Sequence, residues 1–157
     1  MPADQTPSSD DIAAIIADHR GMEGPLLPIL HAIEHAFGHV PQAALPLIAE
    51  ALNISRAEVH GVMSFYHDFR EVPAGRRVVK LCRAEACQAV GGAAVAAEVL
   101  ADLGLNWQET TPDGAVTVEA VYCLGLCACG PAAMIGDRVH GRISAARMRA
   151  LLAEATP

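Results

Sequence analysis

The chain has 157 residues, which is enough for one ordinary domain or two small ones with a buried core. Its 18 acidic and 11 basic residues give a formal net charge of −7, which argues against an electrostatic grip on nucleic acid or anionic lipid. The N-terminus lacks the basic and apolar regions of a signal peptide, and no uncharged apolar run reaches membrane-spanning length. We therefore expect a cytoplasmic protein without nucleic-acid binding or membrane insertion.

The first part of the chain is predicted to be helical. Residues 1–10 are polar and acidic and are expected to be disordered, and a helical bundle is expected over residues 11–70. Gly38 and Asn53 each follow an apolar segment, at a position where a left-handed residue commonly ends a helix. Ser55 and Glu58 have the spacing of a capping box, which predicts a helix from there through Tyr66.

The second part is predicted to mix strands and helices. A linker is expected over residues 71–76, where a proline and a glycine interrupt the pattern, and a separate domain over residues 77–157. The expected elements are, in chain order, a strand leading into Cys82, a helix ended by Gly104, a strand from Val116 to Tyr122, a hairpin around Gly136 and Asp137, and a helix from Ala145 to Ala153. This order predicts a small α/β layer.

All five cysteines belong to this second domain, at positions 82, 87, 123, 127 and 129. Cys82 and Cys87 have four residues between them, and Cys123 and Cys127 have three. Both pairs begin where a predicted strand ends, so the loops can turn their thiols toward one place. Clustered thiols in the reducing cytoplasm indicate metal or redox chemistry more often than a disulfide.

The spacing favours one kind of site. Structural zinc sites and thioredoxin-type redox centres favour two residues between paired cysteines, which neither pair has. A [2Fe–2S] cluster takes two thiolates per iron and tolerates longer gaps. A fifth thiolate would have no iron to bind, so Cys129 is expected to be a small, partly buried residue beside the site. A zinc-stabilised interaction module and a thiol redox enzyme stay as alternatives.

Several segments together resemble a known family. They are "LLPILHAIEHAFGHVPQAALPLIAEALNISRAEVHGVMSFYHDFR", the first cysteine pair, "ETTPDG", and "CLGLC" followed closely by Gly130 and Pro131. Over roughly residues 12–150 the chain resembles the thioredoxin-like [2Fe–2S] ferredoxin subunit of respiratory complex I and its relatives. The resemblance implies an α+β protein, with an N-terminal helical bundle followed by a thioredoxin-like α/β domain. It also implies that Cys82, Cys87, Cys123 and Cys127 are the ligands of one [2Fe–2S] cluster.

Two further segments, "LCRAEACQAVGG" and "GPAAMIGDRVHGRIS", look most like the gamma subunit of soluble NAD-dependent, molybdenum-containing formate dehydrogenases. That resemblance implies a non-catalytic electron-transfer subunit. Its partners would be a flavin- and NAD-binding subunit with further iron–sulfur clusters and a molybdenum-containing catalytic subunit. FMN, NAD and the molybdenum cofactor would be bound only by those partners. The equivalent subunit of an NADH:quinone oxidoreductase or a bidirectional hydrogenase is the alternative.

Other features receive plainer interpretations. Arg83, and with it Lys80, is expected to place positive charge beside the cluster, with a solvated arginine near a loop as the alternative for Arg83. Phe65, Tyr66 and Phe69 are expected to pin their helix to its own core, with an interface as the alternative. The segment from His31 to His35 matches the H-x-x-E-H pattern of some zinc proteases. Because no third ligand is visible, these histidines are expected to lie at the solvent or core edge of a helix.

Overall fold

The computed structural model describes residues 7–154, which divide into two compact units with the boundary between Pro73 and Ala74. We call them the helical unit and the sheet unit. The boundary falls within the segment 71–76 that was expected to be a linker. Residues 1–6, where most of the N-terminal disorder was expected, lie outside the described residues.

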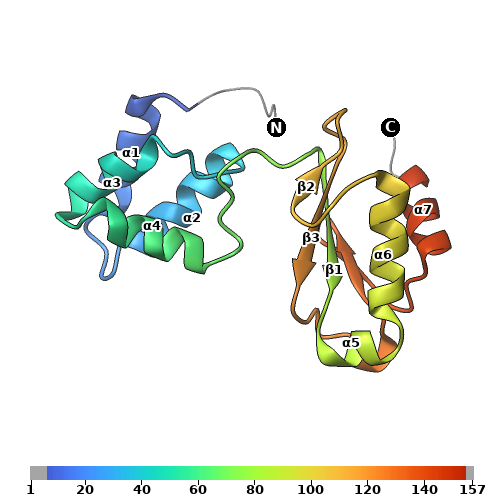
Figure 1. The fold of residues 1–157 in the computed structure, drawn as a ribbon. Coiled ribbons are helices and arrows are strands. Elements are labelled where there is room, and N and C mark those ends of the chain that lie inside the picture. Colours follow the sequence, from blue (N-terminus) through green and yellow to red (C-terminus); the bar gives the residue numbers. More distant parts are fainter. Residues whose placement is uncertain (1–6, 155–157) are drawn as a thin grey trace. The chain divides into compact units, whose positions relative to one another are not determined.

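The helical unit has four helices within the described residues (Figure 1): α1 Ser9–His19, α2 Leu26–Phe37, α3 Ala44–Leu52 and α4 Arg56–Phe65. Helix α1 begins two residues before the predicted start of the bundle. The reason is a capping box at Ser8, whose hydroxyl accepts the Asp11 N–H at 3.1 Å while the Asp11 carboxylate accepts the Ser8 N–H at 3.3 Å. The expected disorder therefore does not extend to residues 8–10.

The predicted helix ends are present. Gly38 and Asn53 have φ values of 73° and 52°, the left-handed conformation that stops a helix. At the start of α4, the Ser55 hydroxyl accepts the Glu58 N–H at 3.2 Å, and the Glu58 carboxylate accepts the Ser55 N–H at 2.7 Å. Helix α4 ends at Phe65, one residue earlier than predicted.

We expect Ser55→Ala to lower the free energy of unfolding of the helical unit by about 1 kcal/mol, because it leaves an N–H of the first turn without its acceptor. Chemical denaturation followed by circular dichroism measures this change. Ser64→Ala is the matched control: its hydroxyl donates to the Gly61 carbonyl from the same helix and caps nothing. An equal loss in both variants would contradict the capping role.

The same cap makes the stability of α4 depend on pH. The hydrogen bond from the Ser55 backbone, together with that from its side chain, holds the pKa of Glu58 below its ordinary value. A carboxyl whose folded-state pKa is depressed stabilises the fold at pH values above its unfolded pKa. That contribution is lost as the pH falls through the depressed value.

Only part of the predicted aromatic core is buried. Phe69 is 7% exposed and packs with the apolar residues of the four helices, whereas Phe65 is 73% exposed and Tyr66 is 44% exposed. The prediction of a core role was therefore wrong for Phe65 and Tyr66. Helix geometry explains the exposure of Phe65, because Met63 is buried and a residue two positions later points to nearly the opposite side, whereas Tyr66 lies beyond the helix in extended backbone.

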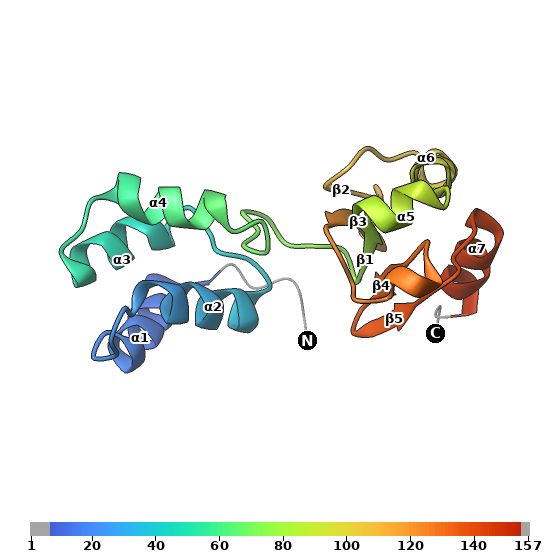
Figure 2. The same ribbon diagram turned by 90° about the horizontal axis from the view of Figure 1, so that it is seen from below.

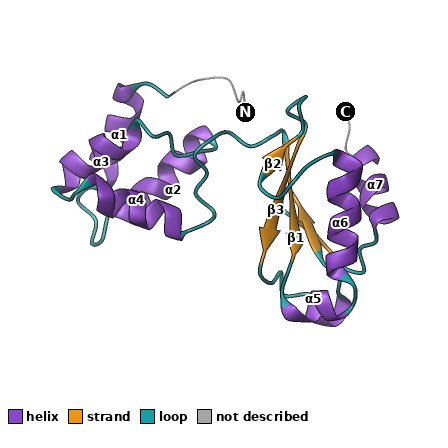
Figure 3. Cartoon of the chain, viewed as in Figure 1, coloured by secondary structure: helices purple, strands orange, loops and turns teal. Residues whose placement is uncertain are grey.

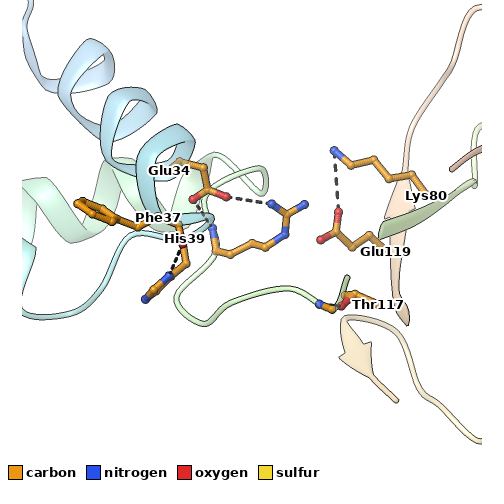
Figure 4. Close-up of polar contacts among 8 residues, drawn as sticks. Glu34, Phe37, His39, Lys80, Thr117 and Glu119 are labelled. Carbon is orange, nitrogen blue, oxygen red and sulfur yellow. Dashed lines mark hydrogen bonds and ion pairs between the residues drawn. The ribbon is translucent and has the colours of Figure 1, made fainter. Parts of the chain in front are cut away.

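An ion pair joins the segment after α4 to α2 (Figure 4). The Arg70 guanidinium donates to the Glu34 carboxylate at 2.9 Å, and the Arg70 backbone N–H donates to the same carboxylate at 3.2 Å. His31 meets the edge of the Phe69 ring, with 4.9 Å between ring centroids. The glutamate of the protease-like pattern thus has a structural partner, in keeping with a helical role for this segment.

The sheet unit contains five strands in the order β2-β3-β1-β4-β5 (labelled in Figure 2; strands are orange in Figure 3). The central strands β1 and β3 are parallel, and the remaining pairs are antiparallel. The bounds are β1 Arg77–Cys82, α5 Glu85–Ala89, α6 Gly92–Leu103, β2 Glu109–Thr110, β3 Val116–Val121, a 3₁₀ helix η1 Cys127–Cys129, β4 Ala133–Ile135, β5 Arg138–His140 and α7 Ala145–Glu154. The sequence did not predict α5, β2 or η1.

Helices α6 and α7 lie on the same face of the sheet (Figures 1 and 2). Val79 of β1 and Val118 of β3 are completely buried there with Met148 of α7. The residues that alternate with these valines form polar contacts. Lys80 and Glu119 lie in register and approach to 3.9 Å (Figure 4).

Four helices followed by a mixed sheet with its own helices confirm the predicted α+β class. Among the described residues, no helix combines the length and the apolar character that crossing a membrane requires.

Candidate metal centre

The two central strands bring both cysteine pairs to one edge of the sheet. Cys82 is the last residue of β1 and lies in register with Val121, the last residue of β3, so Cys123 follows two residues beyond the same edge. Parallel strands end on the same side, and their following loops therefore lie close together. The sequence predicted this convergence from the strand ends.

The first loop carries a buried pair of thiols. After Cys82 the chain makes a short turn into α5, which places Cys87 on the helix with only 1% of its surface exposed. Cys82 is 6% exposed, and both pack with Ala132 in a small apolar cluster. The helix α5 was missed because five residues of mixed character carry no helical period.

Hydrogen bonds give the two buried thiols different acidity. Burial acts to raise the pKa of the Cys82 thiol, but backbone N–H groups of Ala84, Cys123 and Leu124 and the Cys87 thiol outweigh it, so this pKa lies below its ordinary value. Burial raises the pKa of Cys87, and the neighbouring Cys82 and Cys127 raise it further. The site thus has backbone donors aimed at a sulfur that can hold negative charge.

The second loop carries an exposed pair. The sulfurs of Cys123 and Cys127 are 3.7 Å apart, and the Gly125 N–H lies 3.4 Å from the Cys123 sulfur. The hydrogen bond and the charge of Cys123 raise the pKa of Cys127, and burial and the charge of Cys82 raise it further. The Cys123 backbone has φ of 112°, a region that residues with a Cβ rarely occupy. Such local strain is concentrated at functional sites.

Two glycines allow the neighbouring chain to press against Cys87. A Cβ on Gly92 would lie 2.6 Å from the Cys87 carbonyl oxygen, and one on Gly130 would lie 3.5 Å from the Cys87 sulfur and 2.9 Å from the Val90 side chain. Gly92 is the first residue of α6. At Gly92 only glycine permits this approach without a shift of the surrounding backbone, whereas at Gly130 the exposed Val90 side chain would have to move.

Cys129 has a structural environment of its own. Its carbonyl accepts the Arg142 N–H at 2.7 Å, and a Cβ on Gly141 would lie 2.8 Å from that same oxygen. The residue is half-buried at the end of η1. Its backbone therefore anchors the segment between β5 and α7, and its exclusion from the ligand set remains a prediction.

The donor set fits a binuclear cluster. Among the described residues, no three or more His, Cys, Asp or Glu side chains lie close enough together to hold a metal ion. The thiols lie instead as two pairs, Cys82 with Cys87 and Cys123 with Cys127, and the pairs interact through Cys82 and Cys127. Two thiolates for each of two irons is the donor set of a [2Fe–2S] cluster.

The two cations named from the sequence have partners. The Arg83 guanidinium lies over the Trp107 ring, 4.9 Å from its centroid, and both line a cavity of about 170 Å³ with Cys82. Lys80 approaches Glu119, whose carboxylate offsets its charge. Arg83 is therefore the cation that the structure holds on the Cys82 side of the site.

We expect Arg83→Gln to lower the reduction potential of a bound cluster by on the order of tens of millivolts, because a nearby cation favours the more negative, reduced state. A redox titration followed by EPR measures the shift. Arg76→Gln is the control, since six residues of extended chain, about 20 Å, separate it from Cys82. No shift in Arg83→Gln, or an equal shift in both variants, would remove Arg83 from this role.

Comparison with known families matches residues 12–156 to the thioredoxin-like [2Fe-2S] ferredoxin family. The chain is 35% identical to one of the NADH-quinone oxidoreductase subunits of Rhizobium meliloti (strain 1021), over 91% of this chain and 85% of that protein. It is 32% identical to the HndA subunit of the NADP-reducing hydrogenase of Solidesulfovibrio fructosivorans, over 84% of this chain and 77% of that protein.

Among solved structures, the chain is similar to the NAD+-reducing [NiFe]-hydrogenase in the air-oxidized state, with a TM-score of 0.66 and 28% identity over 82% of this chain. The match covers 22% of the hydrogenase chain, so this protein spans about a fifth of that chain's length.

Proposed function

The chain belongs to the thioredoxin-like [2Fe–2S] ferredoxin family, and from that premise we propose that it is an electron-transfer subunit of an NAD-linked oxidoreductase complex. Its one [2Fe–2S] cluster would be held by Cys82, Cys87, Cys123 and Cys127. The observation that carries the proposal is the convergence of two thiol pairs at the shared edge of β1 and β3.

When bound, such a cluster supplies the exchange of one electron at a time. The residues of this chain hold it and set its charge balance. Cys82 and Cys87 would ligate the cluster on its apolar side, and Cys123 and Cys127 would ligate it on the side open to water. The N–H groups directed at Cys82, and that of Gly125 at Cys123, stabilise negative charge on sulfur and so favour the reduced state.

We propose that turnover belongs to partner subunits. NAD exchanges two electrons and one such cluster exchanges one, so a partner must carry a flavin that divides electron pairs. The partners would be a flavin- and NAD-binding subunit with iron–sulfur clusters and a molybdenum-containing catalytic subunit, in the cytoplasm. FMN, NAD and the molybdenum cofactor would be bound by these partners alone.

The parent complex we propose is an NAD-dependent formate dehydrogenase. The support is the amino-acid sequence of two segments, the Cys82–Cys87 segment and the β4–β5 hairpin. Both resemble the corresponding segments of the gamma subunit of that enzyme. The names of the relatives favour a second candidate, an NADH-quinone oxidoreductase or an NAD(P)-linked hydrogenase. Co-purification of the native complex distinguishes the two candidates. Stoichiometric molybdenum supports formate dehydrogenase, whereas nickel or bound quinone supports the second candidate.

The experiment that tests the cluster itself is metal and acid-labile sulfide analysis of anaerobically purified chain, with EPR before and after dithionite. Two irons and two sulfides, silent when oxidised and giving an S = 1/2 signal when reduced, would support the proposal. One zinc without sulfide or signal would replace it with a zinc-stabilised interaction module. Turnover with a dithiol reductant and no metal would indicate a thiol redox enzyme.

A further inference from the structure

A groove of about 990 Å³ lies on the helical unit. One wall is a face of α4 formed by Glu58, Gly61, Val62 and Phe65, and Tyr66 extends this wall directly after the helix ends. These residues recur at intervals of three and four, so they form one continuous stripe along the helix. The other wall comes from the α1–α2 connection, the start of α2 and the end of α3.

The groove gathers exposed apolar side chains. Among the described residues seven large hydrophobic side chains are exposed, and three of them, Met22, Phe65 and Tyr66, line this groove. Phe65 is 73% exposed and meets Tyr66 edge to face, with 5.2 Å between ring centroids. A contiguous exposed apolar patch of this kind marks an interaction site more often than an isolated exposed residue does.

The spacing of the lining residues on α4 favours a helical partner. A partner helix that lays its own apolar stripe into a groove is a common recognition mode, with anchors at the same three- and four-residue intervals. The α4 stripe runs for about two turns, from Glu58 to Phe65, which is the length over which such anchors repeat.

The charge of the helical unit identifies the chemistry of its occupant. Residues 1–73 contain ten acidic and three basic residues, a formal charge of −7 with neutral histidines, whereas residues 74–157 contain eight of each. The whole net charge of the protein therefore resides on the unit that carries the groove. A like-charged second copy, an anionic membrane and a nucleic acid are all repelled by it.

We propose that the groove binds a basic amphipathic helix of a partner protein. The apolar face of that helix would cover Phe65, Tyr66 and Met22, and its lysines and arginines would face the acidic surroundings. Glu23, between the lining residues Met22 and Gly24, and Glu58 supply negative charge at the groove, and Arg20 adds one positive charge. The inference uses the helical unit alone and is independent of the proposed cluster.

The test in the native complex is photo-crosslinking with benzoylphenylalanine at position 65 of the full chain. We expect cross-links to one partner segment of positive charge with an amphipathic helical pattern. Val72 is the matched control position, because it is 70% exposed in the same unit but does not line the groove. The proposal would be overturned by cross-links only to a second copy or to an acidic segment. It would also be overturned if both positions cross-linked to the same partner segment, or if position 65 gave no cross-link.

A binding measurement supplies an independent arm with three helical peptides of about 18 residues each. The first peptide has a leucine stripe and lysines at the other positions. The second has glutamate in place of each lysine, and the third has the residues of the first peptide in scrambled order. We expect the first to bind the full chain about tenfold more tightly than the others, and Phe65→Ser to weaken it about tenfold while Val72→Ser does not. Equal binding of the lysine and glutamate peptides, or no loss in Phe65→Ser, would contradict the proposal. The cluster-free Cys87→Ala chain should bind the peptide as the native chain does.

Discussion

The Cys87→Ala chain, purified without oxygen, is expected to retain at most about a tenth of the native iron and acid-labile sulfide. Cys87 is 1% exposed and lies beside Cys82, so its thiol closes the buried side of the site. Alanine lacks the sulfur donor, so one iron would lack a protein ligand. Iron and sulfide analysis with the absorbance spectrum measures the loss, and circular dichroism checks that the fold is kept.

Cys129→Ala is the matched control, because it removes the same atom from a cysteine two residues beyond Cys127. Its backbone contacts with Gly141 and Arg142 do not use the thiol, so full iron and sulfide are expected. A loss equal to that of Cys87→Ala would place Cys129 among the ligands. Full retention in Cys87→Ala would show that the ligand set named from the sequence is wrong.

Gly92→Ala is expected to destabilise the sheet unit by about 1–3 kcal/mol and to shorten the lifetime of a bound cluster. The added Cβ would meet the Cys87 carbonyl oxygen at 2.6 Å and its carbon at 2.9 Å, and both are backbone atoms without rotational freedom. The corner between α5 and α6 would have to move, and Cys87 would move with it. Thermal unfolding and the rate of iron release to a chelator measure the two effects.

Gly61→Ala tests whether this effect is specific. An added Cβ at Gly61 meets nothing within 4 Å, and the residue lies inside α4. Replacing a helical glycine by alanine in open space is expected to stabilise the helix by up to about 1 kcal/mol. The same substitution therefore has opposite signs at the two positions, and destabilisation of similar size in both variants would refute the close-packing explanation.

Much of the fold could be predicted because its signals are local. The left-handed helix ends at Gly38 and Asn53 and the capping box at Ser55 depend on the identity of one or two residues. The convergence of the cysteines could also be predicted, since it needs only two strands that end at one edge. The ligand set itself stays a prediction that the iron and sulfide analysis tests.

The remaining features depend on packing that the sequence does not reveal. Helix α5 is too short to show a period, yet it fixes where Cys87 points. The φ of 112° at Cys123 follows from the close return of its loop, and no residue preference announces it. Arg83 was named for its proximity in sequence to Cys82, but only the fold shows that it lies on Trp107. Phe65 illustrates the converse, an aromatic residue that is too far around its helix to enter the core.

The unequal exposure of the two thiol pairs has a consequence for biogenesis. Cys82 and Cys87 take their places as the sheet and α5 fold, while Cys123 and Cys127 in the isolated chain stay open to water. In the proposed site, iron and sulfide would therefore reach a domain that has already folded from the exposed side formed by Cys123 and Cys127. Chelators and oxygen would reach the proposed cluster from the same exposed side.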